Sequence, residues 1–328
     1  MQNYEIVVFT NNDFDAYHQI VNTNNDMLVS LDTQKRRKWW CFDNPYSGAF
    51  AVALADGQVA ATCYLAGKLL LLNGTRYKTY EIGETATAPA HQRKGLFSQL
   101  VKTCTKYAFD NGAIAVYGTP NSQSTPGYGK LGFTIIDDAR SHLFLSPNLT
   151  GFMASKVAKP VTGLKLNENL KENSYRITST EYFSRTKQRT RLNLFSEEYF
   201  DWRFKGLSPD RYKFFQRGEF LMAVREAKLG KYRVLMVSEF GYLDAKSYTF
   251  DTIKEIRKIY TNEFYDWDFA GIYFNCEWDA TLNSIRYGLK QLIHHRPLPI
   301  CVATNGNPRF IEQLRSAALP QLSDCDIG

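Results

Sequence analysis

The sequence predicts an α/β protein built from two halves. A strand over residues 79–88 is stopped by Pro89, and a short basic turn leads into a helix whose apolar residues, Leu96 and Leu100 among them, recur on one face. Strands and helices alternate along residues 1–145 in the order β-α-α-β-β-β-α-β-α-β, which is typical of a mixed domain. A chain of 328 residues is long for one domain and sufficient for two.

The elements of the first half follow from apolar periodicity and from turn residues. Asn12 or Asp13 is a suitable N-cap for the first helix, and Asp56-Gly57 between two apolar runs predicts a hairpin. Gly112 is expected to end the helix that begins near Leu96. The expected elements are strands over 4–9, 48–55, 58–66, 77–88, 113–117 and 133–136, and helices over 11–27, 33–42, 96–111 and 121–130.

The second half repeats features of the first. Trp202-Arg203-Phe204 followed by Pro209 parallels Trp40-Cys41-Phe42 followed by Pro45, and a pair of strands comes next in both halves. The remaining pattern predicts strands over 214–226, 232–240, 269–274 and 298–303, and helices over 250–264 and 280–287. A Pro-, Gly- and Lys-containing stretch over 146–175 reads as a linker between the halves.

Composition and charge narrow the class of protein. The hydrophobic content of 44% and charged content of 22% are ordinary for a soluble globular chain. Nearly all of the net charge of +7 lies in residues 151–192, either as a solvated basic linker or as a surface for an anionic partner. No nucleic-acid motif, no apolar run of about 20 residues for a membrane and no signal peptide is evident. We therefore expect a cytoplasmic protein without nucleic-acid or membrane partners.

The six cysteines and the histidines do not form a metal-binding pattern. No Cys-x-x-Cys spacing occurs, and His294-His295 has no partner at metal-ligand spacing. The sequence therefore predicts reduced, mostly buried thiols and no metal.

The turn after Pro89 has the features of a phosphate site. A strand that breaks into a turn and then starts a helix leaves several backbone N–H groups without intrahelical partners, and the helix dipole places partial positive charge there. Gly95 allows the backbone to approach a ligand closely.

Two motifs in this region resemble those of the GNAT acyltransferases, which bind acetyl-CoA. Residues 92–97, Gln-Arg-Lys-Gly-Leu-Phe, resemble the family's Gln/Arg-x-x-Gly-x-Gly/Ala pyrophosphate loop, between a strand and a helix as the family requires. Asn121 followed by Tyr128-Gly129-Lys130-Leu131-Gly132-Phe133 resembles the family's Asn…Tyr-x-Lys-x-Gly-Phe segment. Phe97 departs from the pattern, because the family most often has Gly or Ala there.

The resemblance implies a GNAT fold for residues 1–145, followed by a linker over 146–175. Residues 176–328 then resemble a degenerate second GNAT-like domain in a tandem arrangement, because residues 239–244 lack the glycine loop and Asp244 would repel pyrophosphate. An unrelated α/β lid is the alternative for this half.

The resemblance also implies where acetyl-CoA, the co-substrate, would bind. The strand residues Thr85, Ala86 and Thr87 would pair with the pantetheine through their backbone, and one of their amides would stabilise the developing oxyanion. Asn121 would cap its segment and hydrogen-bond the pantetheine arm. The residues of the pyrophosphate loop are Gln92, Arg93, Lys94, Gly95, Leu96 and Phe97.

The resemblance further implies catalytic and acceptor-binding residues. Tyr128 would protonate the thiolate of coenzyme A, because a phenol with a pKa of about 10 keeps its proton at neutral pH. Glu81 and Glu84 both remain candidates for the base, and unless a bulge intervenes only one of them can face the cleft. The candidate walls of the acceptor site are Trp39, Trp40 and Tyr46, although core packing is an alternative role for a tryptophan.

The function implied is an acetyl-CoA-dependent N-acetyltransferase that acts on the primary amine of a small molecule, with an amino sugar as one candidate. Two alternatives stay open: a protein or peptide N-acetyltransferase, and a non-catalytic, CoA-binding regulatory protein, which only Phe97 favours.

Overall fold

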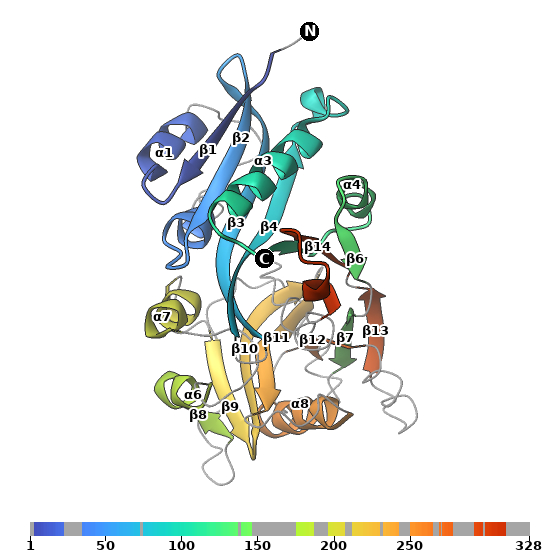
Figure 1. Ribbon diagram of the computed structural model, residues 1–328. Helices are drawn as coiled ribbons and strands as arrows, with labels where there is room; N and C mark the ends of the chain where they lie inside the picture. The colour runs from blue at the N-terminus through green and yellow to red at the C-terminus, as the bar shows by residue number, and fades with distance from the viewer. Residues whose placement is uncertain are drawn as a thin grey trace. The chain divides into compact units, whose positions relative to one another are not determined.

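The computed structural model describes two seven-stranded sheets with helices packed against them (Figure 1). The chain divides into two compact units, of which the first comprises Met1–Ile136, Asp201–Leu207 and Pro299–Ser316 and the second the remainder. The residues described are 3–22, 35–72, 75–136, 139–145, 175–186, 196–206, 212–229, 232–242, 250–264, 269, 271–277, 292–297 and 299–312.

The first sheet has the strand order β1-β2-β3-β4-β5-β14-β6. Neighbouring strands are antiparallel except β4 and β5, which run parallel. The strands are β1 (Glu5–Thr10), β2 (Gly48–Ala55), β3 (Gln58–Leu72), β4 (Thr75–Thr87), β5 (Ala115–Gly118), β6 (Thr134–Ile136) and β14 (Ile300–Thr304).

The predicted hairpin at Asp56-Gly57 is confirmed. Asp56 and Gly57 have φ values of 51° and 77°, the left-handed conformations that a type I′ turn requires. The turn sets the register in which β2 pairs with β3. Alternate residues of β2 are alanines that belong to the core beneath α3 (Leu96–Asp110), and small side chains allow this helix to approach the sheet closely.

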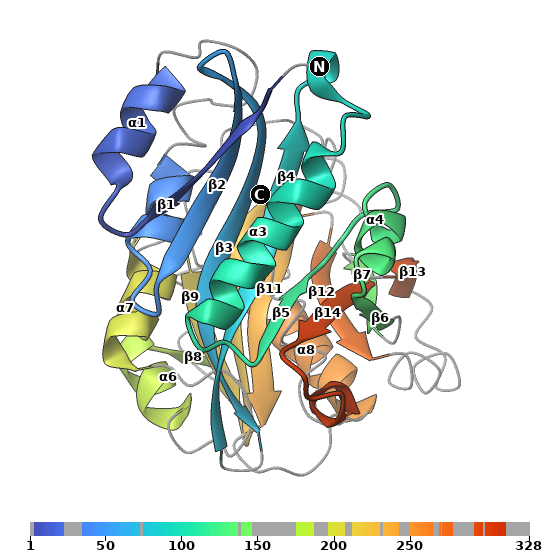
Figure 2. The ribbon, with the colours of Figure 1, turned by 45° about the horizontal axis from the view of Figure 1, so that its top comes forward.

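Helices cover the two faces of this sheet (Figure 2). Apolar residues of α3 pack against Tyr80 and Ile82 of β4, and α4 (Thr125–Lys130) follows β5. The other face carries α1 (Phe14–Asn22) and η1 (Lys38–Phe42), where Tyr17 of α1 contacts Phe50 of β2.

The N-terminal helices differ in detail from the prediction. Asp13 stands before α1 as expected, where its carbonyl accepts a hydrogen bond from the Tyr17 N–H at 2.9 Å. Its carboxylate accepts hydrogen bonds from the Thr10 backbone N–H at 2.8 Å and the Thr10 hydroxyl at 2.7 Å. The helix expected over 33–42 ends as a π-helix, with the Asp43 N–H donating to the Lys38 carbonyl at 2.9 Å. Residues 23–34 lie outside the described part of the chain.

The second sheet has the order β13-β7-β12-β11-β10-β9-β8. Its helices are α6 (Ser179–Thr186), α7 (Glu197–Lys205) and α8 (Phe250–Glu263). Its strands are β7 (Ala139–Leu145), β8 (Arg176–Ile177), β9 (Tyr212–Arg217), β10 (Phe220–Leu229), β11 (Tyr232–Tyr242), β12 (Gly271–Glu277) and β13 (Leu292–Pro297).

Three expectations for the second half need correction. The single strand expected over 214–226 is a hairpin of β9 and β10, because Gly218 takes a left-handed conformation and reverses the chain. β13 was not predicted. The strand expected over 298–303 forms, but as β14 of the first sheet. The expected linker over 146–175 and the expected helix over 280–287 fall outside the described residues, except for Tyr175.

The two sheets share one strand order but take one strand each from the other half of the sequence. β14 lies between β5 and β6, and β7 lies between β12 and β13, so β7, which the sequence placed in the first domain, pairs in the second sheet (Figure 1). Both β4 and β11 also contain a register shift against the preceding strand. The shared order is consistent with a tandem arrangement of GNAT-like halves.

We expect a fragment of residues 1–145 to be unstable, because without β14 the edges of β5 and β6 lose their hydrogen-bond partners. Joining residues 299–312 to residue 136 through a flexible linker restores this strand. Urea unfolding followed by circular dichroism should give a higher midpoint for the fusion than for the fragment, and equal midpoints would contradict the role of β14.

Candidate active site

The parallel strands β4 and β5 separate in the middle of the first sheet. They pair only from Thr79 to Glu81. A methyl group at Gly118, the last residue of β5, would lie 2.5 Å from the carbonyl oxygen of Ile82, so the strands diverge from a point of close contact. Beyond it, Ala86 and Thr87 pair with β3 on one side, and no described strand pairs with residues 85–87 on the other. The backbone edge of these three residues is therefore open to hydrogen bonding by a ligand.

A β-bulge interrupts β4 just after this separation. The register against β3 shifts between Thr62 and Tyr64, and Glu84 has a φ of 42°, which is strained for a residue other than glycine. The extra residue reverses the alternation of side chains, so Glu81 and Glu84 both face the η1 side of the sheet, where their cationic partners lie. The bulge is the exception that the sequence analysis had left open.

The predicted phosphate loop joins β4 to α3. Pro89–His91 form a turn of 3-10 helix (η2), and Arg93 and Gly95 have φ values of 60° and 79°. The first helical hydrogen bond of α3 runs from the Gln99 N–H to the Gly95 carbonyl at 3.1 Å. The N–H groups of residues 96–98 precede it, at the positive end of the helix dipole. Residues 92–95 are exposed, so the loop can accept a diphosphate from solvent.

We expect Gly95→Val to lower the affinity for acetyl-CoA, because a β-branched residue is disfavoured at a φ of 79° and would move the loop. Gly112→Val is a matched control, since Gly112 has a φ of 80°, ends α3 and has open space around it. Isothermal titration should show weaker binding for the first variant and unchanged binding for the second. Equal affinities in both would show that the loop does not bind the cofactor.

Tyr128 lies on the opposite side of β4 from the carboxylates. Its hydroxyl is 3.2 Å from the hydroxyl of Thr85, and its ring is packed between Phe97 and Phe133. Burial raises the pKa of Tyr128 well above its usual value, with further contributions from the Cys63 and Cys301 thiols. The phenol is therefore a proton donor at neutral pH, although its side chain is only 4% exposed.

Phe97 occupies the loop position where the resemblance led us to expect a smaller residue. Its ring packs edge-on against Tyr128 with centroids 5.2 Å apart. A methyl group at Gly127 would lie 2.7 Å from this ring. Gly127 thus makes room for Phe97, and the departure from the family pattern is matched by a glycine on α4.

Asn121 caps the segment that leads into α4. Its side-chain oxygen accepts hydrogen bonds from the backbone N–H groups of Gln123 at 3.0 Å and Ser124 at 2.9 Å. Asn121 is exposed. The predicted capping role is confirmed, and the contact with pantetheine stays a prediction.

Glu81 is part of a buried ion pair. Its carboxylate lies 2.7 Å from the ammonium of Lys68, and both side chains are 2% exposed. The ammonium also lies over the rings of Trp40, at 5.4 Å, and Tyr117, at 5.9 Å. This surrounding of cation and aromatic rings fits a structural role for Glu81.

We expect Lys68→Met to lower the free energy of unfolding by about 3–5 kcal/mol, because it leaves the Glu81 charge buried without its ammonium. The double variant Lys68→Met/Glu81→Gln should lose less free energy of unfolding than Lys68→Met alone, because no charge is then left unpaired. Lys38→Met, which breaks the exposed pair with Asp43, should cost about 1 kcal/mol or less. Chemical denaturation measures all three. Equal losses for the Lys68 and Lys38 variants would contradict the structural role.

Glu84 is held by two arginines that precede η1. It pairs with Arg36, and its Oε2 accepts a hydrogen bond from Nε of Arg37 at 3.1 Å. The Glu84 side chain is 21% exposed, so solvent or a substrate can reach it. Of the two predicted bases, Glu84 is therefore the more exposed.

The predicted acceptor walls lie in different surroundings. Trp39 and Trp202 stack at 4.8 Å, and the indole N–H of each donates to the backbone carbonyl of the other at 2.7 Å. Trp39 and Trp40 are buried, and Tyr46 is half-buried. The contacts of Trp39 are those of a packing residue. The ring of Trp40 instead contacts the Lys68 ammonium, which pairs with Glu81.

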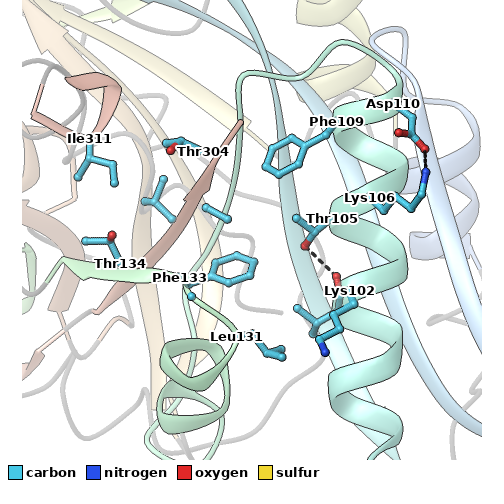
Figure 3. Close-up of a pocket in the computed structure, with 14 residues that line it drawn as sticks. Lys102, Thr105, Lys106, Phe109, Asp110, Leu131, Phe133, Thr134, Thr304 and Ile311 are labelled. Carbon is cyan, nitrogen blue, oxygen red and sulfur yellow. Dashed lines mark hydrogen bonds and ion pairs between the residues drawn. The ribbon is translucent and has the colours of Figure 1, made fainter. Parts of the chain in front are cut away.

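A cavity of about 550 Å³ lies beside the C-terminal half of α3 (Figure 3). The turn from Leu131 to Thr134 and strand β14 form its other walls, and Lys102 and Lys106 lie at its border. None of the predicted site residues lines it. No sequence pattern indicated this cavity, because β14 is distant from α3 along the chain.

The described residues contain no helix that is long and apolar enough to cross a membrane. Within the same residues, no group of three or more His, Cys, Asp and Glu side chains is arranged to hold a metal ion. Cys41, Cys63, Cys104 and Cys301 are free and buried, as the sequence predicted, and burial raises the pKa of Cys301 to about 12.

Comparison with protein families identifies the first half of the chain. Residues 9–136 match the acetyltransferase (GNAT) domain family. These residues therefore form a GNAT domain, and this domain supports an acyltransferase activity for the protein. No curated protein matches the sequence.

Solved structures share the fold over most of the chain. A GCN5-related N-acetyltransferase from Anabaena variabilis is 10% identical with a TM-score of 0.58, and the match covers 92% of this chain and 73% of the other. One from Kribbella flavida is 12% identical with a TM-score of 0.54, covering 92% and 71%. Eis1 from Mycobacterium abscessus is 10% identical with a TM-score of 0.52, covering 92% and 73%. At these identities the similarity is one of fold.

Proposed function

We propose that this acyltransferase is an acetyl-CoA-dependent N-acetyltransferase that acetylates a primary amine of a small molecule by direct attack. The observation that carries the proposal is the open edge of β4 at Thr85–Thr87, followed by the Gly95 turn and the N-terminus of α3. An extended pantetheine would pair with that edge, and the pyrophosphate oxygens would accept hydrogen bonds from the backbone N–H groups of the turn.

The roles of the side chains follow from the two faces of β4. Glu84, on the η1 side, would take a proton from the acceptor ammonium, after which the amine attacks the thioester carbonyl. A backbone N–H of Thr85–Thr87 would stabilise the oxyanion. As the C–N bond forms and the C–S bond breaks, the leaving thiolate would take the proton of Tyr128, and the second proton lost from the nitrogen would return to the tyrosinate through solvent. Glu81 would hold Lys68 and the aromatic rings in place.

The acceptor is proposed to enter from the side of η1, where Trp40 lies against the Lys68 ammonium, and Tyr46 stays a candidate wall. An amino sugar stays one candidate among small amines. A protein or peptide acceptor and a non-catalytic CoA-binding protein are the competing functions, and the packing of Phe97 against Gly127 removes part of the reason for the latter.

We expect acetyl-CoA to bind in isothermal titration and to release free thiol when amines are added. Tyr128→Phe and Glu84→Gln should each lower kcat by about 10²–10⁴-fold with little change in acetyl-CoA affinity, because each removes one proton-transfer group. Glu81→Gln should lower the midpoint of thermal unfolding, with a smaller fall in kcat than Glu84→Gln causes.

Binding of acetyl-CoA without thiol release on any amine would favour the regulatory protein. Absence of binding would refute both this function and that alternative. A fall in kcat with Glu81→Gln but not with Glu84→Gln would exchange the roles of the two carboxylates.

A further inference from the structure

Arg36 and Arg37 converge on one carboxylate although they are consecutive residues. Side chains of neighbouring helical residues do not ordinarily face the same way. Here Arg36 pairs with Glu84, and Arg37 donates through Nε at 3.1 Å. The next residue, Lys38, pairs instead with Asp43 at 2.6 Å. The convergence is therefore specific to the two arginines.

The group of Arg36, Arg37 and Glu84 carries a surplus positive charge. Two guanidinium groups face one carboxylate. The side chain of Arg36 is 37% exposed and that of Arg37 6% exposed, so the group extends from the core toward solvent. A second anion would balance this charge.

Arg37 retains unused hydrogen-bonding capacity. Its buried Nη1 makes no hydrogen bond among the described residues. The charge of Arg37 counteracts the burial that raises the pKa of the neighbouring Tyr17. A buried guanidinium nitrogen without a partner is costly, and a ligand oxygen could satisfy it only after local rearrangement.

The same contacts oppose the proposed role of Glu84 as a base. A carboxylate whose oxygens accept hydrogen bonds from two guanidinium groups is a poor acceptor for a proton from an ammonium group. Glu84 must lose at least one of these partners before it can act. Both arginines are held by hydrogen bonds to this one carboxylate, so an anion that binds them competes directly with Glu84.

Building on the function proposed above, we propose that the acceptor carries an anionic group next to its amine and that Arg36 and Arg37 bind this group in exchange for Glu84. The anion of the acceptor replaces the carboxylate on Arg36, the more exposed of the two arginines. The released Glu84 then faces the acceptor ammonium and takes its proton. The acceptor class is therefore an amine that bears a carboxylate or a phosphate.

Matched amines test the proposal on the full chain loaded with coenzyme A for binding and with acetyl-CoA for turnover. The carboxylate arm compares 4-aminobutyrate with n-butylamine, and the phosphate arm compares O-phosphoethanolamine with ethanolamine. In one arm the anionic member should bind about tenfold to a hundredfold more tightly, as expected for a charge-assisted hydrogen bond to arginine. The arm that shows the preference identifies the anion.

Variants separate this exchange from a purely structural ion pair. Arg36→Ala should abolish the preference, and Lys38→Ala, the matched control from the same segment, should keep it. Glu84→Gln should bind the anionic amine more tightly while kcat falls, because the competing carboxylate is gone. A structural role would not produce these opposite changes.

The proposal is overturned if neither arm shows a preference in the wild-type chain, if Arg36→Ala keeps the preference, or if Glu84→Gln weakens binding of the anionic amine. The function itself is judged separately by acetyl-CoA binding and by thiol release with uncharged amines. Turnover without an anionic preference would leave the N-acetyltransferase function standing and remove only the acceptor class.

Discussion

The early end of the pairing between β4 and β5 is the constraint on which the site depends. Backbone N–H and C=O groups inside a sheet are normally paired, so a strand that leaves its neighbour exposes groups that must find other partners. The strands separate just after Gly118. A Cβ atom at this position would lie 2.5 Å from the Ile82 carbonyl oxygen, so only glycine fits there. In the function proposed above, the open edge, the turn at Gly95 and the start of α3 would together bind an extended ligand with a diphosphate.

The bulge at Glu84 adds chemistry to this geometry. Glu84 and Thr85 are consecutive, so their side chains point to opposite faces of β4. Glu84 meets arginines on the η1 side, and Thr85 meets Tyr128 on the α3 side. A candidate base and a candidate acid therefore flank the same stretch of β4 from opposite faces. The strain at Glu84 is offset by its two ion pairs. Glu81 precedes the bulge and forms a buried ion pair with Lys68.

Local sequence patterns predicted those structural features that are determined by residues close together in the chain. The Asp56-Gly57 turn, the break at Pro89 and the apolar face of α3 were all visible, because each follows from turn chemistry or helical periodicity. The bulge at Glu84 was not, since a register shift depends on the partner strand. The position of β14 was also missed, because pairing between residues 300–304 and β5 leaves no local signal. The arginine pair was overlooked for the same reason.

The central claim is that the edge of β4 and the turn before α3 bind the cofactor together. Hydrogen–deuterium exchange with and without acetyl-CoA tests it at backbone resolution, because both surfaces are defined by N–H groups. We predict slower exchange in the cofactor complex at residues 85–87 and at residues 95–98, with no change at Gly112 at the far end of α3. Cofactor binding that leaves exchange at both segments unchanged would contradict the account.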